Sequence, residues 1–194
     1  MDTFKLYFGL GAEHILDIRG YDHILFVVAL TSIYLLKDWK SVLILVTAFT
    51  IGHSITLAMA TLRVINFNSE LIEFLIPLTI FITALANLIR KRPEYSTKKI
   101  QINYWLALFF GLIHGMGFSY YLRSLLGTDR SIFTQLLAFN VGLEIGQIVI
   151  VISFMVISFL FVEILRVPRR DWKMIISAGV AAIAITLMIS TKFW

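Results

Sequence analysis

Long apolar runs fill most of the chain and are separated by short polar segments. A transmembrane helix needs about 20 mostly apolar residues, and the runs near that length cover residues 20–36, 39–62, 70–90, 104–125, 132–165 and 172–190. The fifth run exceeds what one span requires, which favours a tilted, kinked or projecting helix. The pattern predicts an all-α polytopic membrane protein of about six transmembrane helices, with one domain over residues 1–194 and the helical bundle at 20–190.

Residues 1–18 precede the bundle and lack an uninterrupted apolar run. We expect them to form a short helix at the membrane interface. A removable signal peptide has a basic stretch, then an apolar run and a cleavage site of small residues. This N-terminal sequence does not follow that pattern, so no removable signal peptide is expected. The longest polar stretch, residues 90–101, is too short for a soluble domain.

The composition agrees with a membrane protein and restricts its chemistry. The chain is 59% hydrophobic and 15% charged, with a mean hydropathy of +0.86, whereas soluble domains carry about 25% charged residues. The net charge of +5 could attract nucleic acid, but the basic residues lie between the apolar runs, where they act as topology signals. No nucleic-acid partner is therefore expected. The sequence has no cysteine, so a bound metal must have nitrogen and oxygen ligands.

The distribution of positive charge orients the predicted bundle. Eleven of the 17 Lys and Arg residues fall in the loops after the first, third and fifth runs. These are Lys37, Lys40, Arg90, Lys91, Arg92, Lys98, Lys99, Arg166, Arg169, Arg170 and Lys173. By the positive-inside rule these loops are cytoplasmic, and we expect both termini to lie outside a bacterial inner (cytoplasmic) membrane.

All four histidines lie in or beside apolar runs. An ionisable side chain at bilayer depth costs free energy and usually has a function. In the predicted topology the histidines share the outer half of the bilayer with two carboxylates. The set comprises His14, His23, His53, His114, Asp22 and Glu144. Because imidazole is the commonest metal-ligating side chain, this shared depth predicts one metal site.

Two carboxylate–imidazole pairs, Glu13–His14 and Asp22–His23, lie on either side of Gly20. A carboxylate beside an imidazole either binds the metal or orients the ring. A bend at Gly20 would fold both pairs onto one site. The alternative is an ordinary polar surface at the membrane interface, which fits His14 better than His23 because histidines at the interface cost little.

The second and fourth runs each contain a histidine that lipid cannot satisfy. His53 is followed by Ser54 in the middle of the second run. His114 lies near Gly111 and Gly115, a small-xxx-small pattern that allows helices to approach closely. Glycine also leaves room for an ion beside the ring. The alternative for His114 is a single interhelical hydrogen bond, with glycine serving packing alone.

Asn140, Glu144 and Gln147 share one face of the fifth run, because they follow helical spacing. Polar side chains on one stripe of an apolar helix point into a bundle or cavity. Glu144 is a carboxylate deep within a run and needs a cation, a proton or another ligand. We therefore expect Glu144 to be a metal ligand, with Ser54, Asn140 and Gln147 as supporting polar groups.

Four segments resemble motifs of HupE/UreJ-type membrane proteins. They are HILDIRGYDHILF at 14–26, FTIGHSITL at 49–57, FGLIHGMGF at 110–118 and FNVGLEIGQ at 139–147. The resemblance implies a hydrogenase or urease accessory protein, a family regarded as permeases for nickel or other divalent metals. It also implies His23, His53 and His114 as the core of the site, with His14 at its edge. The implied partners are the metal ion, membrane lipid, a second copy of the chain and proteins of metalloenzyme maturation.

The first function that fits this site is a permease or binding protein for Ni²⁺ or a similar cation, such as Zn²⁺, that enters from outside. Asn87, Asn140 and Gln147 are the polar groups available for the route inward. Such transporters are commonly built from two related halves, and no internal repeat is evident in the sequence.

The second function is an intramembrane zinc-dependent hydrolase, since three histidines and an open coordination position form a catalytic zinc site. Asp22 or Glu144 would act as the base for metal-bound water, and Ser54 would support an oxyanion. The substrate would be a lipid or an amide. A third function is that of a non-catalytic metal-binding membrane subunit.

Overall fold

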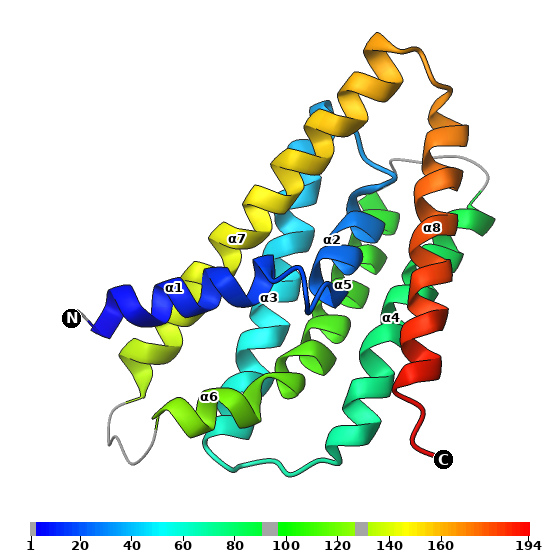
Figure 1. Cartoon of the computed structure of the whole chain (residues 1–194). Helices are drawn as coiled ribbons and strands as arrows, with labels where there is room; N and C mark the ends of the chain where they lie inside the picture. The colour runs from blue at the N-terminus through cyan, green and yellow to red at the C-terminus, as the bar shows by residue number, and fades with distance from the viewer. Residues whose placement is uncertain (1–2, 91–96, 127–131) are drawn as a thin grey trace.

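The computed structural model describes residues 3–90, 97–126 and 132–194. These residues form helices and connecting segments, with no strand among them, so the all-α prediction is confirmed for the described chain. The α-helices are α1 (Thr3–Leu16), α2 (Asp22–Thr31), α3 (Trp39–Thr61), α4 (Ser69–Ile89), α5 (Thr97–Gly117), α6 (Ser119–Leu126), α7 (Phe133–Phe159) and α8 (Arg169–Ser190), as Figure 1 shows. A 3-10 turn at Leu36–Asp38 leads into α3, and a π-helix at Leu160–Ile164 extends α7.

Within the described ranges, four helices are long and apolar enough to cross a membrane. They are Leu36–Thr61, Ser69–Ile89, Phe133–Ile164 and Arg169–Ser190, and Asp22–Thr31 and Ile102–Gly117 are shorter apolar helices. The predicted count of six spans is therefore not confirmed. In place of the first predicted span, 20–36, α2 has only 10 residues. Its length of about 15 Å is half of a hydrocarbon core of about 30 Å.

The fourth predicted span, 104–125, is interrupted. Helix α5 ends at Gly117, and α6 begins at Ser119 and runs in a new direction (Figure 1). Glycine loses more backbone entropy in a helix than other residues, so Gly115 and Gly117 together weaken the helix at this point. The hydroxyl of Ser119 donates to the carbonyl of Met116 at 2.8 Å and stabilises the break. An apolar run of sufficient length therefore does not guarantee one continuous helix.

Helices α3 and α5 approach each other at backbone distance. A Cβ added at Gly52 would overlap a backbone carbonyl of α5. A Cβ at Gly111 or Gly115 would overlap the carbonyl of Phe49 or His53 in α3. These glycines therefore have the packing role that the small-xxx-small pattern predicts.

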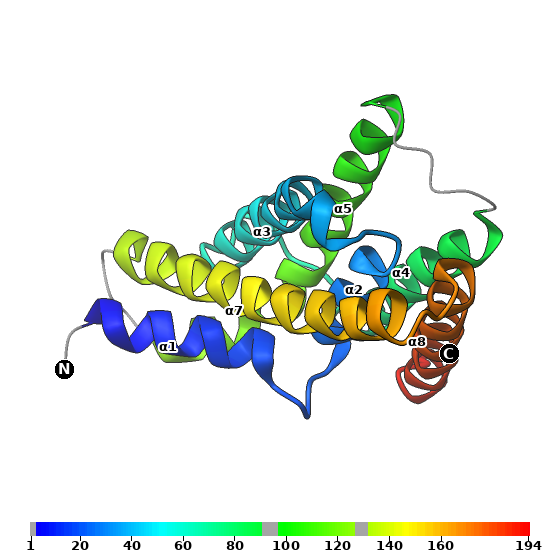
Figure 2. The ribbon, with the colours of Figure 1, turned by 90° about the horizontal axis from the view of Figure 1, so that it is seen from above.

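Helices α1 and α7 form a second pair of the same kind. A Cβ at Gly11 would overlap the carbonyl of Phe139, and one at Gly142 would overlap the carbonyl of Phe8. Gly146 packs closely on the side chain of Ile15. Seen from above, α1 lies along α7, and both point the same way (Figure 2). The N-terminal helix is thus held against a long apolar helix of the bundle.

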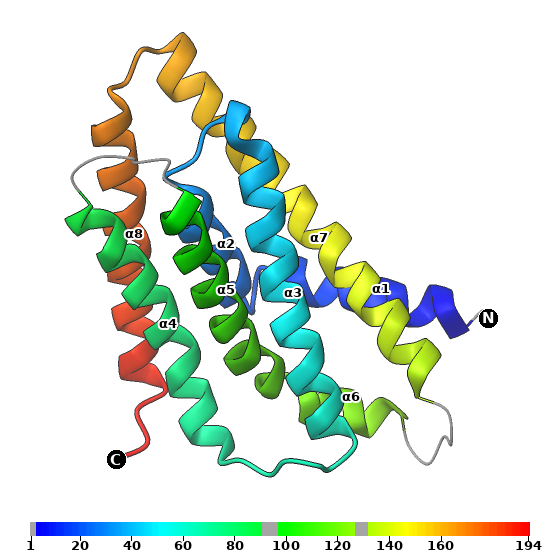
Figure 3. The ribbon, with the colours of Figure 1, turned by 180° about the vertical axis from the view of Figure 1, so that it is seen from behind.

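The remaining helices complete the bundle around α2. Helices α4 and α8 lie side by side, and α4 also packs against α5 (Figure 3). Helix α2 is enclosed and packs against α1, α4, α7 and α8, whereas α6 packs chiefly against α3 and α5. In the view of Figure 1, α3, α5 and α8 run downward along the chain, and α4 and α7 run upward.

Candidate metal centre

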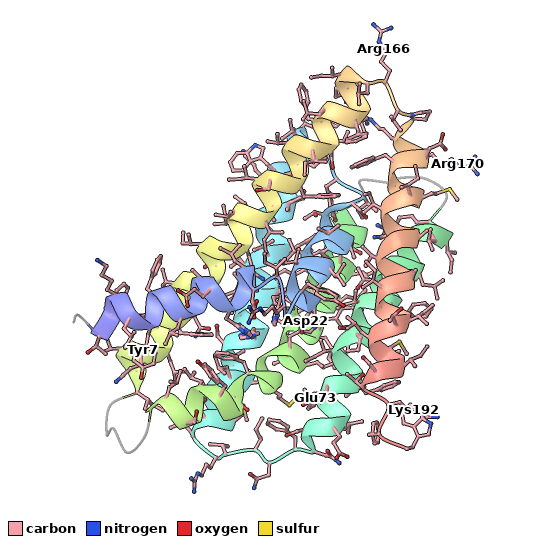
Figure 4. All side chains as sticks on the ribbon, in the orientation of Figure 1. Tyr7, Asp22, Glu73, Arg166, Arg170 and Lys192 are labelled. Atoms are coloured by element: carbon pink, nitrogen blue, oxygen red, sulfur yellow. The ribbon has the colours of Figure 1, made fainter. Side chains whose placement is uncertain are left out.

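The four histidines of the chain converge from four helices on one region of the interior. His14 lies near the end of α1, His23 near the start of α2, His53 within α3 and His114 near the end of α5. The ring centroid of His23 lies 4.6 Å from that of His14, 5.9 Å from that of His53 and 5.1 Å from that of His114. His23 is therefore at the centre of the group. Figure 4 shows its neighbour Asp22 in the interior of the bundle, beside α2.

The bend between α1 and α2 brings the first two histidines together. A carboxylate oxygen of Asp17 accepts a hydrogen bond from the backbone N–H of Arg19 at 2.8 Å, and Gly20 follows in the same bend. Helix α2 then starts at Asp22 and runs into the bundle. In the structure His14 thus lies beside His23, with Gly20 in the bend between their helices.

Asp22 fixes the orientation of the His23 ring. One carboxylate oxygen of Asp22 lies 3.1 Å from Nδ1 of His23 and also accepts the backbone N–H of His23 at 3.0 Å. Because a carboxylate only accepts, Nδ1 carries the proton. The buried Nε2 of His23 has no hydrogen-bond partner among the described residues, so it is the ring atom that a neutral His23 would offer to an ion. In metal sites such a carboxylate holds the ligating imidazole in the required tautomer.

Thr79 of α4 plays the corresponding role for His114. Its hydroxyl donates to the carbonyl of Ile76 at 2.7 Å and lies 3.0 Å from Nε2 of His114. A hydroxyl has one proton to donate. Since the carbonyl takes that proton, the Thr79 oxygen accepts a hydrogen bond from Nε2–H. Nδ1 of His114 therefore has a free lone pair, and it is buried without a hydrogen-bond partner in the described structure.

We expect Thr79→Val to lower the metal affinity roughly 10–100-fold, which is the usual effect of removing an outer partner of a metal-bound histidine. Valine keeps the branched shape of the side chain but cannot accept from His114. Thr79→Ser keeps the hydroxyl and should retain the affinity. Titration calorimetry on the protein in detergent measures the difference. Equal affinities for the valine and serine variants would contradict the assigned tautomer of His114.

His53 is fully buried, and neither of its ring nitrogens has a hydrogen-bond partner among the described residues. Burying a polar atom without a partner costs free energy, so an unpaired nitrogen in a core requires an explanation. Nε2 of His14 is unpaired in the same way. Burial, reinforced by the nearby His23, lowers the pKa of His14 well below its usual value. The His14 ring is therefore neutral at pH 7 and offers a lone pair.

The side chains form two sets whose ligand atoms lie within 4.8 Å of one another. One set is His14, His23 and His53, and the other is Asp22, His23 and His114. Two ligands on opposite sides of an ion, each at about 2.1 Å, are roughly 4.2 Å apart. A small contraction would thus close either set on an ion, and nitrogen and oxygen ligands suit Ni²⁺ or Zn²⁺. His14, expected at the edge of the site, is a full member of one set.

The family of the chain is shown by comparison with known proteins. A family model described as HupE / UreJ protein matches residues 1–193. The chain belongs to the HupE/UreJ family. Curated proteins and solved structures give no match. Together with the four long apolar helices, the family identifies this HupE/UreJ chain as a membrane protein.

In this HupE/UreJ protein the polar stripe of α7 contacts α3 and lies outside both sets. The hydroxyl of Thr47 donates to Glu144 at 2.8 Å, and that of Thr50 donates to Gln147 at 2.6 Å. Asn140 is half-buried, and its side-chain oxygen is unpaired in the described structure. The expectation that Glu144 ligates the ion therefore continues to rest on the sequence alone.

Ser54 also makes a contact within the protein. Its hydroxyl donates to the backbone carbonyl of Thr50 at 2.6 Å, one turn earlier in α3. This is the usual hydrogen bond of a serine or threonine in an apolar helix. The proton of Ser54 is thus engaged with its own helix, and the supporting role expected for this residue is not visible in its contacts.

Two cavities of the HupE/UreJ protein are lined by residues of the candidate metal centre, one by His14 and the other by Asp22. One, of about 690 Å³, lies beside α1 and the start of α6, and His14, Asp17 and Phe118 are among its lining residues. The other, of about 260 Å³, lies where α4 begins and α8 ends, and its lining includes Asp22 and Glu73. Figure 4 shows Glu73 below Asp22, toward this end of the bundle. One cavity therefore leads to Asp22 from the start of α4, and the other leads to His14 from the side of α1.

Sequence reasoning missed two residues that contact the histidines. Thr79 hydrogen-bonds its own helix, as most such threonines do, so only the folded structure reveals its contact with His114. Phe118 packs on His14 with ring centroids 3.9 Å apart and stacks on Phe139 at 5.0 Å. Its position depends on the break after Gly117, which the apolar pattern does not predict.

Proposed function

We propose that this HupE/UreJ protein is a membrane permease for a divalent cation, Ni²⁺ or Zn²⁺, held by its four histidines and Asp22. The observation that supports the proposal is the convergence of buried imidazole nitrogens without hydrogen-bond partners in the described structure. A cation would satisfy these nitrogens together, because neutral imidazole is a preferred ligand of both metals. The link of the family to nickel favours Ni²⁺ as the transported ion.

Charge supports the direction of transport. By the positive-inside rule, the excess of Lys and Arg in three loops favours a cytoplasmic position for these loops, with both termini outside a bacterial inner membrane. The cation would enter from the outer side, through the cavities that reach His14 and Asp22. On the inner side it would pass to a protein of metalloenzyme maturation, and a second copy of the chain is a further candidate partner.

Metal analysis and flux test the proposal together. Protein purified without chelator and loaded with Ni²⁺ should retain about one ion per chain. After reconstitution it should move Ni²⁺ into liposomes that contain a fluorescent chelator. Asp22→Asn should bind the ion more weakly, because the tautomer of His23 is no longer fixed by a charged acceptor. Retained metal without flux above that of empty liposomes would rule out a permease.

The set His14, His23 and His53 also favours a second candidate, a zinc-dependent hydrolase, because three protein ligands leave one position for water. In that case Asp22 or Glu144 would be the base. Two contacts weigh against it, since Asp22 is engaged with His23 and the Ser54 hydroxyl is engaged with Thr50. The hydrolase would be favoured if the zinc-loaded protein hydrolyses lipids or amides and transports no metal ion. This hydrolysis should be lost in Asp22→Asn.

A further inference from the structure

The helix pairs α3–α5 and α1–α7 make the same contacts at matching residues. Gly111 in α5 packs on the carbonyl of Phe49 in α3. Gly11 in α1 packs on the carbonyl of Phe139 in α7. Helix α1 therefore corresponds to α5 with an offset of 100 residues, and α3 corresponds to α7 with an offset of 90.

The reciprocal contacts follow the same offsets. Gly52 in α3 packs on the carbonyl of Leu108, and Gly142 in α7 packs on the carbonyl of Phe8. The sequences also agree in this register, since AFTIGHSI at 48–55 and AFNVGLEI at 138–145 share four of eight residues. The shared phenylalanine and glycine are the residues that make the contacts. The similarity is therefore structural as well as sequential.

The two halves run in opposite directions through the bundle. Helix α3 runs downward and α7 upward, while α4 runs upward and its neighbour α8 downward (Figures 1 and 3). Helices α1–α4 and α5–α8 thus form an inverted repeat. Transporters with such repeats bind their substrates at the boundary between the halves.

The metal centre lies at this boundary. His14 and His114 are equivalent positions in the two halves, because they differ by the same offset of 100. The ring of His23 lies beside both of them, with centroids 4.6 Å and 5.1 Å away. Each half therefore supplies one of the equivalent histidines, and α2 supplies the ring between them.

Helices α2 and α6 depart from the symmetry. Helix α2 is enclosed among α4, α7 and α8, whereas its counterpart α6 packs chiefly on α3 and α5. Helix α2 starts at Asp22 in the metal centre and is followed by Ser32, which lines a cavity of about 270 Å³. Arg90 and Lys173 also line this cavity, at the end of the bundle assigned to the cytoplasm. Helix α2 thus separates the metal centre from the cytoplasmic cavity.

On the basis of the proposed transport function, we propose that α2 is the moving barrier of an alternating-access carrier. The structure has α2 inserted, so the cytoplasmic side is closed. If the two halves exchange conformations, α6 enters the bundle and α2 withdraws. Asp22 and His23 then move away from the cation, because they are part of α2. Because α6 has no histidine or carboxylate, no ligand replaces them, and cation binding weakens as the cytoplasmic route opens.

The glycine contacts determine which parts move together. Within α3–α5 and α1–α7 the backbones touch, so neither pair can slide without backbone overlap. Packed units of this kind move as rigid bodies, and bends between elements absorb the change. The bends on either side of α2, at Gly20 and between Ser32 and Trp39, are the available hinges.

A reversible cross-link between α2 and α4 tests the moving barrier. Nδ2 of Asn87 in α4 lies 3.1 Å from Oγ of Ser32, and the chain has no native cysteine. The double variant Ser32→Cys/Asn87→Cys is joined by oxidation or by a short bifunctional thiosulfonate, and mass spectrometry measures the yield. Ni²⁺ binding and Ni²⁺ flux are then compared before cross-linking, after it and after reduction. The two single-cysteine variants are matched controls.

Cross-linking should lower Ni²⁺ flux at least about tenfold, since the rate-limiting movement is blocked. Ni²⁺ binding should persist, and reduction should restore flux. Unchanged flux in the cross-linked protein would overturn the moving barrier while leaving the permease intact. Wild-type protein that binds Ni²⁺ without transporting it would overturn both, so the two failures are distinguishable.

Discussion

His53→Ala is expected to lower the affinity for Ni²⁺ or Zn²⁺ by on the order of 100-fold or more, because loss of an outer partner alone costs 10–100-fold. His53 is a complete ligand candidate, since it is fully buried and both of its ring nitrogens are free of hydrogen-bond partners among the described residues. It also belongs to one of the two ligand sets. Titration calorimetry measures the affinity, and flux into liposomes should fall in parallel.

A thermal measurement separates this effect from misfolding. Removing the imidazole deletes two unpaired polar atoms from the core, and this gain offsets part of the cost of the cavity that alanine leaves, so the metal-free variant should still fold. Ni²⁺ at about 100 times its dissociation constant adds about 2.7 kcal/mol to the wild type, which raises Tm by roughly 5–10 °C. The variant should show no such rise. A wild-type rise that persists in His53→Ala would show that the ion binds elsewhere.

Glu144→Gln is the informative comparison for the same assay. The Glu144 carboxylate accepts from Thr47 and lies outside both ligand sets. Glutamine retains an oxygen that can accept from Thr47. If the ion is held by the histidines and Asp22, this variant should bind Ni²⁺ with wild-type affinity. A loss similar to that of His53→Ala would instead restore Glu144 as a ligand.

Gly111→Ala is expected to destabilise the protein by roughly 1–3 kcal/mol, near the upper end of that range. The added Cβ would overlap the carbonyl of Phe49, which is a backbone atom and cannot rotate away. Helices α3 and α5 would have to separate, and with them His53 and His114. Tm of the purified protein in detergent should fall by roughly 5–10 °C.

Gly9→Ala provides the matched control. Gly9 is also helical, but a Cβ built there meets nothing within 4 Å. Alanine is favoured over glycine in a helix by about 0.5–1 kcal/mol, so this variant should be as stable as the wild type or slightly more stable. Equal losses of Tm for Gly111→Ala and Gly9→Ala would contradict the close packing of α3 on α5.

The apolar pattern predicted the helices well where a run formed one continuous element. The second, third and sixth runs correspond closely to α3, α4 and α8. The apolar pattern failed to predict the helices of the first and fourth runs. Hydropathy measures how apolar a segment is, and it does not show where the backbone turns. The turn after Thr31 and the break after Gly117 arise from local backbone preferences and tertiary contacts.

The candidate site was predicted in outline. Common depth in the predicted topology and the carboxylate beside His23 indicated that the histidines belong together. The sequence could not show that His14 lies against His23, since this depends on the packing of α1 on α7. It also could not reveal the hydrogen bond from His114 to Thr79, which joins residues 35 positions apart.

The internal repeat escaped detection for a physical reason. Only residues at the backbone contacts, such as Gly11 and Gly111, are constrained to be alike in the two halves. The remaining positions face different lipid or protein neighbours and are free to differ. Helices α4 and α8, for example, correspond by position and packing but show little similarity in sequence. The contacts in three dimensions therefore reveal a relationship that the linear pattern conceals.

The ring of Phe118 connects the metal centre to the outer surface of the bundle. It lies at the junction of α5 and α6, and it packs on His14 and Phe139. Displacing α6 would carry this ring off the imidazole. Linkage between two sites is reciprocal. If a bound ion stabilises the position of α6, then stabilising α6 strengthens ion binding by the same free energy. A lipid or protein that docks on α6 would thus act as an allosteric effector of metal affinity without touching a ligand.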